Sequence, residues 1–131
     1  LKPNGVFAIT SKGAMVVSTR QFVQIASHDS VYEATQSGPM LLEHGIVHPI
    51  FEDASYHYNI RSGVAAPTPN QVILVISRTE VTLYDFATLF RDELKCNDAL
   101  YLDGDITRMY APALGRRDTG SCAGIIGVVA R

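Results

Sequence analysis

The residues with the clearest chemical capacity lie at the end of a short apolar run. Asp103 follows residues 99–102, which have the composition and length of a strand, and it precedes Gly104 and Asp105. Binding and catalytic residues concentrate in loops at strand ends, and a carboxylate there could act as an acid or a base. An Asp-Gly pair is also a common turn. On spacing alone, the turn is the favoured interpretation of Asp103.

Residues 36–38 form a second segment that could bind an anion. Gln36 offers a side-chain donor, and Ser37 and Gly38 could offer hydroxyl and backbone donors to an oxyanion. The surrounding sequence is not a GxSxG elbow and therefore does not predict a serine nucleophile. An ordinary turn at a strand end explains the same residues and is favoured when they are taken alone.

Residues 61–63 form a third segment of this kind. Arg61 places a guanidinium beside Ser62 and Gly63, where the backbone is small and adaptable. A planar guanidinium suits a phosphate or a carboxylate because it can donate two parallel hydrogen bonds. A surface ion pair is the alternative interpretation of Arg61.

The acidic and imidazole side chains do not predict a metal site. The four histidines show neither an HExxH nor an HxH spacing: His28, His44, His48 and His57. Asp103 and Asp105 alternate as carboxylates do in a Ca²⁺-binding loop, but the remaining ligands of such a loop are missing. We therefore expect no cofactor, with Ca²⁺ at this loop as the alternative.

The clearest predicted element is a helix over residues 81–97, which leads into the strand that carries Asp103. Thr82 can cap a helix, and Asp85 three residues later gives a capping-box pattern. One apolar stripe of helical period follows, made of Leu83, Phe86, Ala87, Phe90 and Leu94. We expect the helix to close at Cys96 and Asn97, because asparagine tolerates the left-handed conformation that often ends a helix.

The first third of the chain predicts short strands joined by turns. One hairpin is expected from residues 6–10 with 14–18, and a second from residues 40–43 with 46–48. Between the two hairpins, a serine or threonine cap predicts a short helix over residues 20–27.

The remaining segments complete the expected fold. Residues 33–37 are expected to be extended, and residues 49–58 and 67–70 to form a loop and a turn. The β-branched run at 72–77 predicts a central strand, and GIIGVVA at 124–130 predicts a buried closing strand. The predicted fold class is α+β, a mostly antiparallel sheet with one principal helix packed on one face.

Length and composition limit the class of protein. The chain has 131 residues, a length typical of one domain, so we expect residues 1–131 to form a single domain. The net charge of −2 without a cluster of Lys and Arg argues against nucleic acid as a partner. No run approaches the roughly 18 apolar residues of a transmembrane helix. The basic pair Arg116–Arg117 is expected in a solvated loop, and Cys96 and Cys122 allow either one disulfide or two free thiols.

Segments along nearly the whole chain carry a resemblance to a known family. They are KPNGVF at 2–7, ATQSGPML at 34–41, NIRSGV at 59–64, residues 81–91, ALYLDG at 99–104 and GIIGVV at 124–129. In this order they resemble the phosphodiester glycosidase family. That family is named for the lysosomal uncovering enzyme, N-acetylglucosamine-1-phosphodiester α-N-acetylglucosaminidase, and the resemblance is closest to its bacterial branch.

The resemblance implies hydrolysis of a sugar-phosphate diester at the glycosidic bond. On this view Arg61 anchors the phosphate, and Asp103 at the reacting centre acts as acid or base or holds the sugar hydroxyls. The residues expected to bind the substrate are Gln36, Ser37, Gly38, Ser62, Gly63, Gly104, Asp105 and Thr107. The expected ligand is a carbohydrate or sugar phosphate, and the expected location is secreted or periplasmic. The resemblance also implies an earlier segment with an Asn-Gly-Gly-Phe-like motif, so this chain is expected to lack the N-terminal part of its domain.

One loop departs from the family pattern. The better-known form continues Leu-Asp-Gly-Gly to a small residue and Ser, whereas Asp105 and Thr107 stand at the second Gly and the Ser here. An additional carboxylate repels a bound anion unless it is protonated or holds a cation. A non-catalytic carbohydrate-binding domain of the same fold is therefore the alternative function, and a purely structural subunit is a third.

Overall fold

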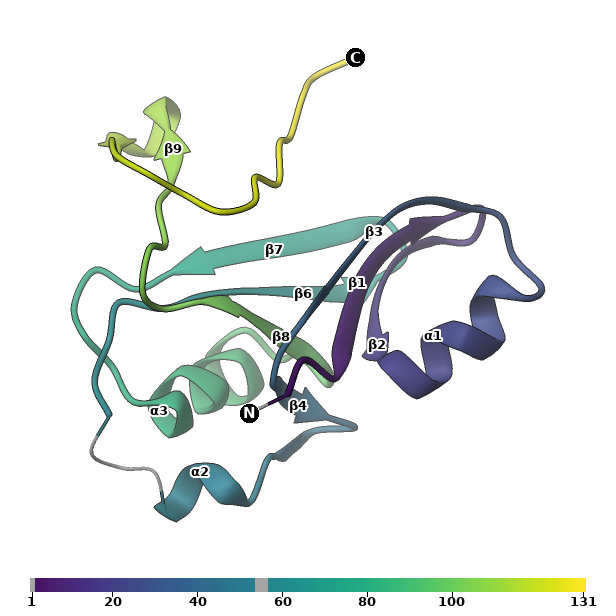
Figure 1. The fold of residues 1–131 in the computed structure, drawn as a ribbon, viewed down its shortest axis with the longest axis horizontal. Helices are drawn as coiled ribbons and strands as arrows, with labels where there is room; N and C mark the ends of the chain where they lie inside the picture. Colours follow the sequence, from purple (N-terminus) through teal and green to yellow (C-terminus); the bar gives the residue numbers. More distant parts are fainter. Residues whose placement is uncertain (1, 54–56) are drawn as a thin grey trace.

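The computed structural model describes residues 2–53 and 57–131, where the chain forms antiparallel sheets and short helices (Figure 1). The first sheet has the order β2-β1-β3 and comprises β1 (Gly5–Thr10), β2 (Gly13–Ser18) and β3 (Val31–Ser37). The second has the order β5-β4-β8-β6-β7 and comprises β4 (Met40–Glu43), β5 (Ile46–Val47), β6 (Ser62–Thr68), β7 (Gln71–Ile76) and β8 (Ala99–Asp103). The third pairs β9 (Tyr110–Ala111) with β10 (Arg116–Arg117).

The helices are all short. They are α1 (Thr19–Ala26), α2 (Ile50–Asp53), α3 (Leu83–Thr88), a π-helix over Leu89–Glu93 that continues α3, and a 3₁₀ turn at Pro112–Leu114. Within the described part of the chain, none of them combines the length and apolar composition that a membrane crossing would need.

The elements stack in layers, in the order α3, second sheet, first sheet and α1 (Figure 1). One apolar cluster, with Phe86 and Phe90, fills the space between α3 and the second sheet. Another, with Phe7 and Leu100, fills the space between the two sheets. Val6 is 3% exposed, and it points away from Phe7 because successive strand residues alternate. Its burial is explained by α1, which contacts β1 and β2.

Strand β8 lies at the centre of this arrangement. It pairs antiparallel with β4 on one side and with β6 on the other, and both of its faces are covered. Residue Asp103, at its C-terminal end, is therefore positioned by a strand that is paired along both edges.

The N-cap predicted at Thr82 is confirmed; the described contacts of this cap do not include the reciprocal bond of a capping box, and the helix differs from the prediction at its end. The Thr82 side chain accepts a hydrogen bond from the Asp85 N–H at 3.0 Å, as expected of an N-cap. The helix widens into the π-helix, and the Cys96 N–H bonds to the Phe90 carbonyl at 2.8 Å. Lys95, with φ of 55°, takes the left-handed conformation that the sequence predicts for Asn97. The helix ends earlier because this bond closes it before Asn97.

The predicted hairpins and first helix are also confirmed. In α1, the Ser18 hydroxyl accepts from the Gln21 N–H at 3.2 Å and the Gln21 side chain accepts from the Ser18 N–H at 3.1 Å, a complete capping box. In the β4–β5 turn, His44 and Gly45 both have positive φ, as a two-residue hairpin turn requires. The turn predicted at 67–70 is shorter, because β6 extends to Thr68.

The α+β class is confirmed, but among residues 2–53 and 57–131 no one helix stands out as the principal one. The eight residues of α1 cover the first sheet, while α3 and its π-helical continuation cover the second. The loop predicted over 49–58 contains the helical turn α2, and residues 54–56 of that prediction lie outside the described residues.

The prediction of a central strand at 72–77 is wrong, since β7 lies at an edge of the second sheet. Ile73 and Val75 pack on the cluster below α3, and Leu74 packs on the cluster between the sheets. Both faces of β7 are therefore covered while one of its edges stays unpaired. An apolar run indicates that both faces of a strand are covered. It does not determine whether the strand lies at the centre or at an edge of its sheet.

The prediction of a buried closing strand at 124–130 is also wrong. This segment has no regular structure, and it runs away from both sheets (Figure 1). Ile125, Val128 and Val129 are more than 80% exposed. Their β-propensity cannot form a strand without a neighbouring edge to supply hydrogen bonds. Cys122, just before this segment, is an exposed free thiol, and Cys96 is a buried free thiol.

Candidate functional site

The ends of three strands meet beside Asp103. Ser62, the first residue of β6, pairs with Asp103, and the next pair is Gly63 with Tyr101, so Leu102 is an additional residue in β8. Such a bulge bends a strand and redirects its side chains, and bulges are common beside active sites. The Ser37 hydroxyl, at the end of β3, donates to the Leu102 carbonyl at 3.2 Å.

A chain of hydroxyl groups continues from this point. The Thr107 hydroxyl donates to the Ser62 hydroxyl at 2.6 Å, and the Ser62 hydroxyl donates to the Asp103 carbonyl at 3.4 Å. Thr107 is only 7% exposed, so this contact fixes the loop that follows β8 against the start of β6.

One oxygen of the Asp103 carboxylate accepts hydrogen bonds from the backbone of its own turn. Its Oδ1 accepts hydrogen bonds from the Gly104 N–H at 2.6 Å and from the Asp105 N–H at 3.0 Å. This is the turn geometry that the sequence favoured for an Asp-Gly pair. No ion pair of the described residues includes Asp103, and its Oδ2 has no protein partner there. The turn therefore orients the carboxylate and leaves one oxygen available.

Arg61 is buried and holds three segments together. It is 3% exposed; its Nε donates to the Val81 carbonyl at 2.8 Å, its Nη1 to the Tyr101 hydroxyl at 3.2 Å and its Nη2 to the His57 carbonyl at 2.6 Å. Its guanidinium carbon lies 5.6 Å from the centroid of the Tyr101 ring. All these partners are uncharged, and the ion pairs among the described residues do not include Arg61.

Tyr101 and Gly104 complete this neighbourhood. Burial raises the pKa of the Tyr101 hydroxyl, while the charge of Arg61 and its hydrogen bond act in the opposite direction. A Cβ added at Gly104 would collide with the Tyr101 hydroxyl and would lie 3.6 Å from Arg61 Nη1. The loop after β8 can therefore approach the Arg61–Tyr101 pair this closely only with glycine at position 104.

The structure brings most of the predicted site residues together. Those at the junction are Ser37, Arg61, Ser62, Asp103, Gly104, Asp105 and Thr107. Tyr101 was missed as a site residue because it lies in an apolar strand sequence, where only its hydroxyl signals a polar contact.

Three predicted residues lie elsewhere or serve packing. The Gln36 side chain donates to the Thr19 hydroxyl at 3.1 Å, away from this junction. A Cβ at Gly38 would lie 2.7 Å from the Asn4 backbone nitrogen, so glycine is needed for the contact with the N-terminal segment. A Cβ at Gly63 would lie 3.0 Å from a Phe86 ring carbon. Gly63 therefore allows α3 to pack closely on β6.

A hollow of about 410 Å³, which we call the basic groove, opens beside Thr107. It is lined by Ile60, Thr107, Arg108, Arg116, Arg117, Asp118 and Thr119. Arg108 donates to the carbonyls of Thr107 at 2.8 Å and Thr119 at 3.1 Å, and Arg116 pairs with Asp118 at 3.1 Å. Three guanidinium groups against one carboxylate give the groove an excess of positive charge. The sequence missed this groove because Arg108 is distant in sequence from the arginine pair.

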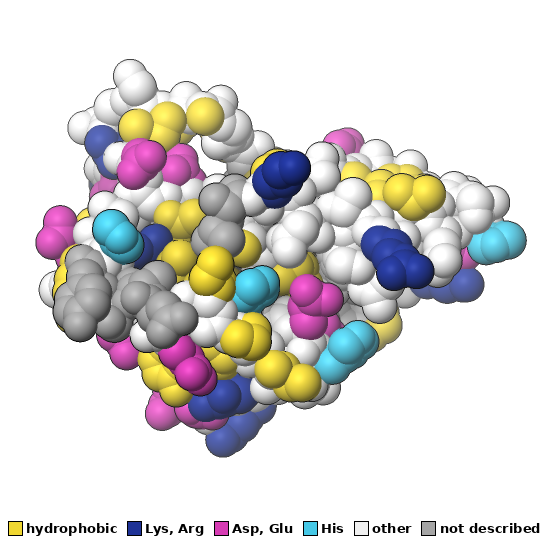
Figure 2. All heavy atoms as spheres, turned by 60° about the horizontal axis from the view of Figure 1, so that its bottom comes forward, with side chains coloured by type: hydrophobic (Ala, Val, Ile, Leu, Met, Phe, Trp, Pro, Cys, Tyr) yellow, Lys and Arg dark blue, Asp and Glu magenta, His cyan; other side chains and the backbone are white. Residues whose placement is uncertain are grey.

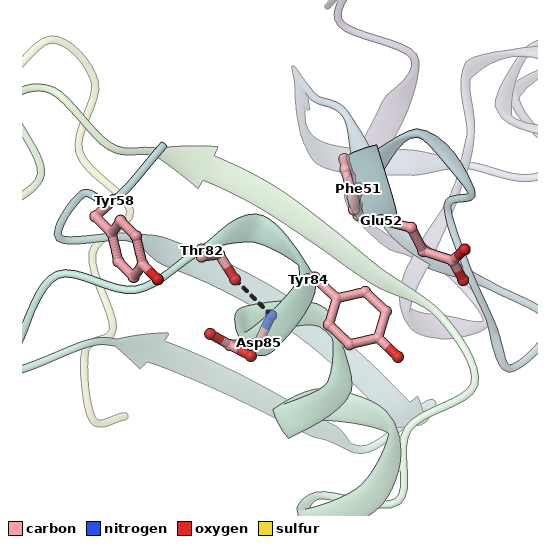
Figure 3. Close-up of a pocket in the computed structure, with 6 residues that line it drawn as sticks. All are labelled: Phe51, Glu52, Tyr58, Thr82, Tyr84 and Asp85. Carbon is pink, nitrogen blue, oxygen red and sulfur yellow. Dashed lines mark hydrogen bonds between the residues drawn. The ribbon is translucent and has the colours of Figure 1, made fainter. Parts of the chain in front are cut away.

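A second hollow of about 350 Å³, which we call the tyrosine pocket, lies at the start of α3 (Figure 3). It is lined by Phe51, Glu52, Tyr58, Thr82, Tyr84 and Asp85. In the same region, apolar and acidic side chains lie side by side on the face that carries α2 and α3 (Figure 2). No motif in the sequence pointed to this pocket, because its residues come from three separate segments.

Among residues 2–53 and 57–131, no group of three or more His, Cys, Asp or Glu side chains is arranged to hold a metal ion. Ca²⁺ at Asp103 and Asp105 remains a prediction without a test.

Comparison with known proteins shows the family of the chain. The model of the phosphodiester glycosidase family matches residues 2–123, so the chain belongs to this family, and the resemblance seen in the sequence is confirmed. A relative from Escherichia coli (strain K12), the uncharacterized protein YigE, is 31% identical over 110 residues. These residues are 84% of this chain and 42% of the relative, so the chain spans less than half of the relative's length.

Proposed function

We propose that the chain hydrolyses a sugar-phosphate diester at the glycosidic bond. Its membership of the phosphodiester glycosidase family supports the reaction class. The observation that carries the proposal is the basic groove, which shares Thr107 with the junction that holds Ser62 and Asp103. A site for an anion and an oriented carboxylate thus lie next to each other.

The proposed roles follow from the charges. Cleavage of the bond between the anomeric carbon and oxygen releases a phosphate monoester, and Arg108, Arg116 and Arg117 stabilise its negative charge. A phosphate is a good leaving group and needs little help from a proton donor. One carboxylate therefore suffices where glycosidases usually employ two. In this proposal, Asp103 takes the proton from the water that attacks the anomeric carbon.

Arg61 has a supporting role in this proposal. Three of its N–H groups bond to protein groups, so it places a positive charge behind the Gly104 loop and positions Tyr101. The other residues proposed to contact the substrate are Ser62 and Thr107, through their hydroxyl oxygens, because the Gly104 N–H already bonds to Asp103.

The test is the release of free sugar from the p-nitrophenyl phosphodiester of N-acetylglucosamine-1-phosphate, on this chain and on a chain extended at its N-terminus. Asp103→Asn keeps an oxygen for the Gly104 and Asp105 N–H groups but removes the charge, and it should lower kcat by about 10²–10⁴-fold. Glu80→Gln, at an exposed position in the turn before α3, is the matched control and should retain activity. Wild-type rates in folded Asp103→Asn would reject the role of Asp103.

A non-catalytic carbohydrate-binding function is the second candidate. It is favoured by the two N–H groups that already bond to Asp103 Oδ1, because a carboxylate held in a turn can accept hydroxyl donors without any reaction. Saturable sugar binding by folded chains that show no turnover would favour this candidate.

A further inference from the structure

We propose that the tyrosine pocket is a subsite for an uncharged sugar ring, separate from the basic groove. This inference rests on the proposed function in one respect, that the substrate contains both a sugar and a phosphate. It assigns the two parts of the substrate to two hollows of opposite charge.

The charge of the tyrosine pocket excludes a phosphate. Among the described residues that line it, the ionisable groups are the carboxylates of Glu52 and Asp85 and the hydroxyls of Tyr58 and Tyr84, and none is Lys or Arg. Carboxylates repel an anion and accept hydrogen bonds from hydroxyl and amide groups. A neutral ligand rich in such donors therefore fits this pocket, whereas the phosphate fits the basic groove.

The walls of the pocket suit a sugar ring. Tyr58 is 55% exposed and Tyr84 is 36% exposed, while Phe51, on α2 beside Glu52, is fully buried. Figure 3 shows Tyr84 between Asp85 on one side and Glu52 on the other, with Tyr58 facing the start of α3. An aromatic ring offers an apolar face together with a polar hydroxyl, which matches the apolar face and polar rim of a sugar. The volume of about 350 Å³ is at the small end of ligand sites, as expected for one ring.

Arg61 connects the two hollows. Its bond to the His57 carbonyl fixes the segment that carries Tyr58, and its bond to the Val81 carbonyl fixes the residue before Thr82. The bridge between Asn59 and Val81 ties the same two segments together. Tyr58 lines the tyrosine pocket and Ile60 lines the basic groove, and residues two apart in an extended chain are separated by about 7 Å. The two subsites thus lie next to each other along one short segment that Arg61 holds.

The experiment measures binding without turnover, on the full chain. The probes are the methyl glycoside of N-acetylglucosamine, glucosamine and inorganic phosphate, each titrated into ¹⁵N-labelled protein and followed by NMR. The neutral glycoside should shift the amide signals of residues 57–59 and 81–85. Inorganic phosphate should instead shift those of Arg108, Arg116 and Arg117.

The variants separate the pocket from the rest of the surface. Tyr84→Ala and Asp85→Asn should each weaken glycoside binding about tenfold, a change equivalent to one lost contact, and should leave phosphate binding unchanged. Asp85→Asn retains the backbone N–H that bonds to Thr82 and serves if Tyr84→Ala does not fold. Tyr32→Ala is the matched control, because Tyr32 is 64% exposed on β3 in the other sheet, and it should bind as the wild type does.

Two results would overturn the inference: no binding of the neutral glycoside, or equal binding by Tyr84→Ala and Asp85→Asn. Binding of glucosamine alone would also overturn it, since the pocket would then select a positive charge. Glycoside binding without turnover would support the subsite and reject the hydrolase. Turnover with an unchanged KM in Tyr84→Ala would support the hydrolase and reject the subsite.

Discussion

The region around α3 and the C-terminal region after Asp103 are stabilised in different ways. Phe86 and Phe90 are at most 2% exposed and contact each other edge to face, with ring centroids 5.3 Å apart. After Asp103, the regular elements have two or three residues each, and every residue from 119 onward is exposed. That region is held by polar contacts, chiefly those of Asp118 with Arg116 and with the Met109 N–H.

The proposed site includes residues from both regions. Asp103 and Ser62 lie on strands of the buried sheet, whereas Arg116 and Arg117 lie on the short strand β10. The carboxylate is therefore attached to a rigid framework, and one wall of the basic groove is attached to a weakly packed hairpin. Stability and anion binding should consequently respond to different substitutions.

The largest effect is expected from Phe90→Ala. This side chain is fully buried, and its removal leaves a cavity that should lower the free energy of unfolding by about 3–5 kcal/mol. Ile125→Ala is the control in the C-terminal region, where the side chain is 83% exposed, and it should change stability little. Urea unfolding measures both, and equal losses in the two variants would contradict the contrast between the regions.

An intermediate effect is expected from Gly63→Ala. The added methyl group would lie 3.0 Å from the Leu100 carbonyl oxygen and from a Phe86 ring carbon, and such overpacking should cost about 1–3 kcal/mol. Gly124→Ala is the matched control, because its methyl group meets nothing within 4 Å. If thermal unfolding showed the two variants to be equally stable, α3 would not be packed on β6 as described.

A fall in pH is expected to have the smallest effect on stability, and this effect should be confined to the C-terminal region. The Met109 N–H lowers the pKa of Asp118 below its ordinary 3.8, and Arg116 adds to this effect. A depressed pKa in the folded state means that Asp118 stabilises the hairpin fully above about pH 4. That contribution disappears as the pH falls through the lower folded pKa. The Met109 amide signal should therefore change below pH 3.8, ahead of the signals of the α3 region.

Asp118→Asn tests this assignment directly. The amide can still accept from the Met109 N–H, but it does not titrate, so the acid-induced change at Met109 should vanish. An unchanged pH profile in this variant would assign the titration to another group.

Local patterns in the sequence predicted those features that depend on a few adjacent residues. The Thr82 cap, the serine or threonine cap before α1 and the His44–Gly45 turn are of this kind, because each is made by contacts within one turn of the chain. The sequence also placed Asp103 and Arg61 in one site, through the resemblance to a family rather than through spacing. Arg61 bonds to the Tyr101 hydroxyl and the Gly104 backbone lies against the same pair, whereas the roles of Asp103 and Arg61 stay predictions.

Features that depend on distant partners were not predictable from the sequence. The edge position of β7 depends on which strands pair, and its apolar run describes only its two covered faces. The basic groove needs Arg108 to meet β10, and that contact depends on hydrogen bonds to Thr119 and on the pairing of β9 with β10. The exposed 124–130 segment shows that apolar composition alone does not create a place for a strand.

That segment has a consequence for the chain in solution. Between Asp118 and Arg131 the sequence has no charged side chain, and the apolar residues of the GIIGVVA stretch are exposed. Uncharged β-branched stretches of this kind readily stack between molecules into cross-β assemblies, and no proline or charge within the stretch acts as a gatekeeper. The colloidal behaviour of the chain should therefore be governed by its last residues, while its thermal unfolding is governed by the core around α3.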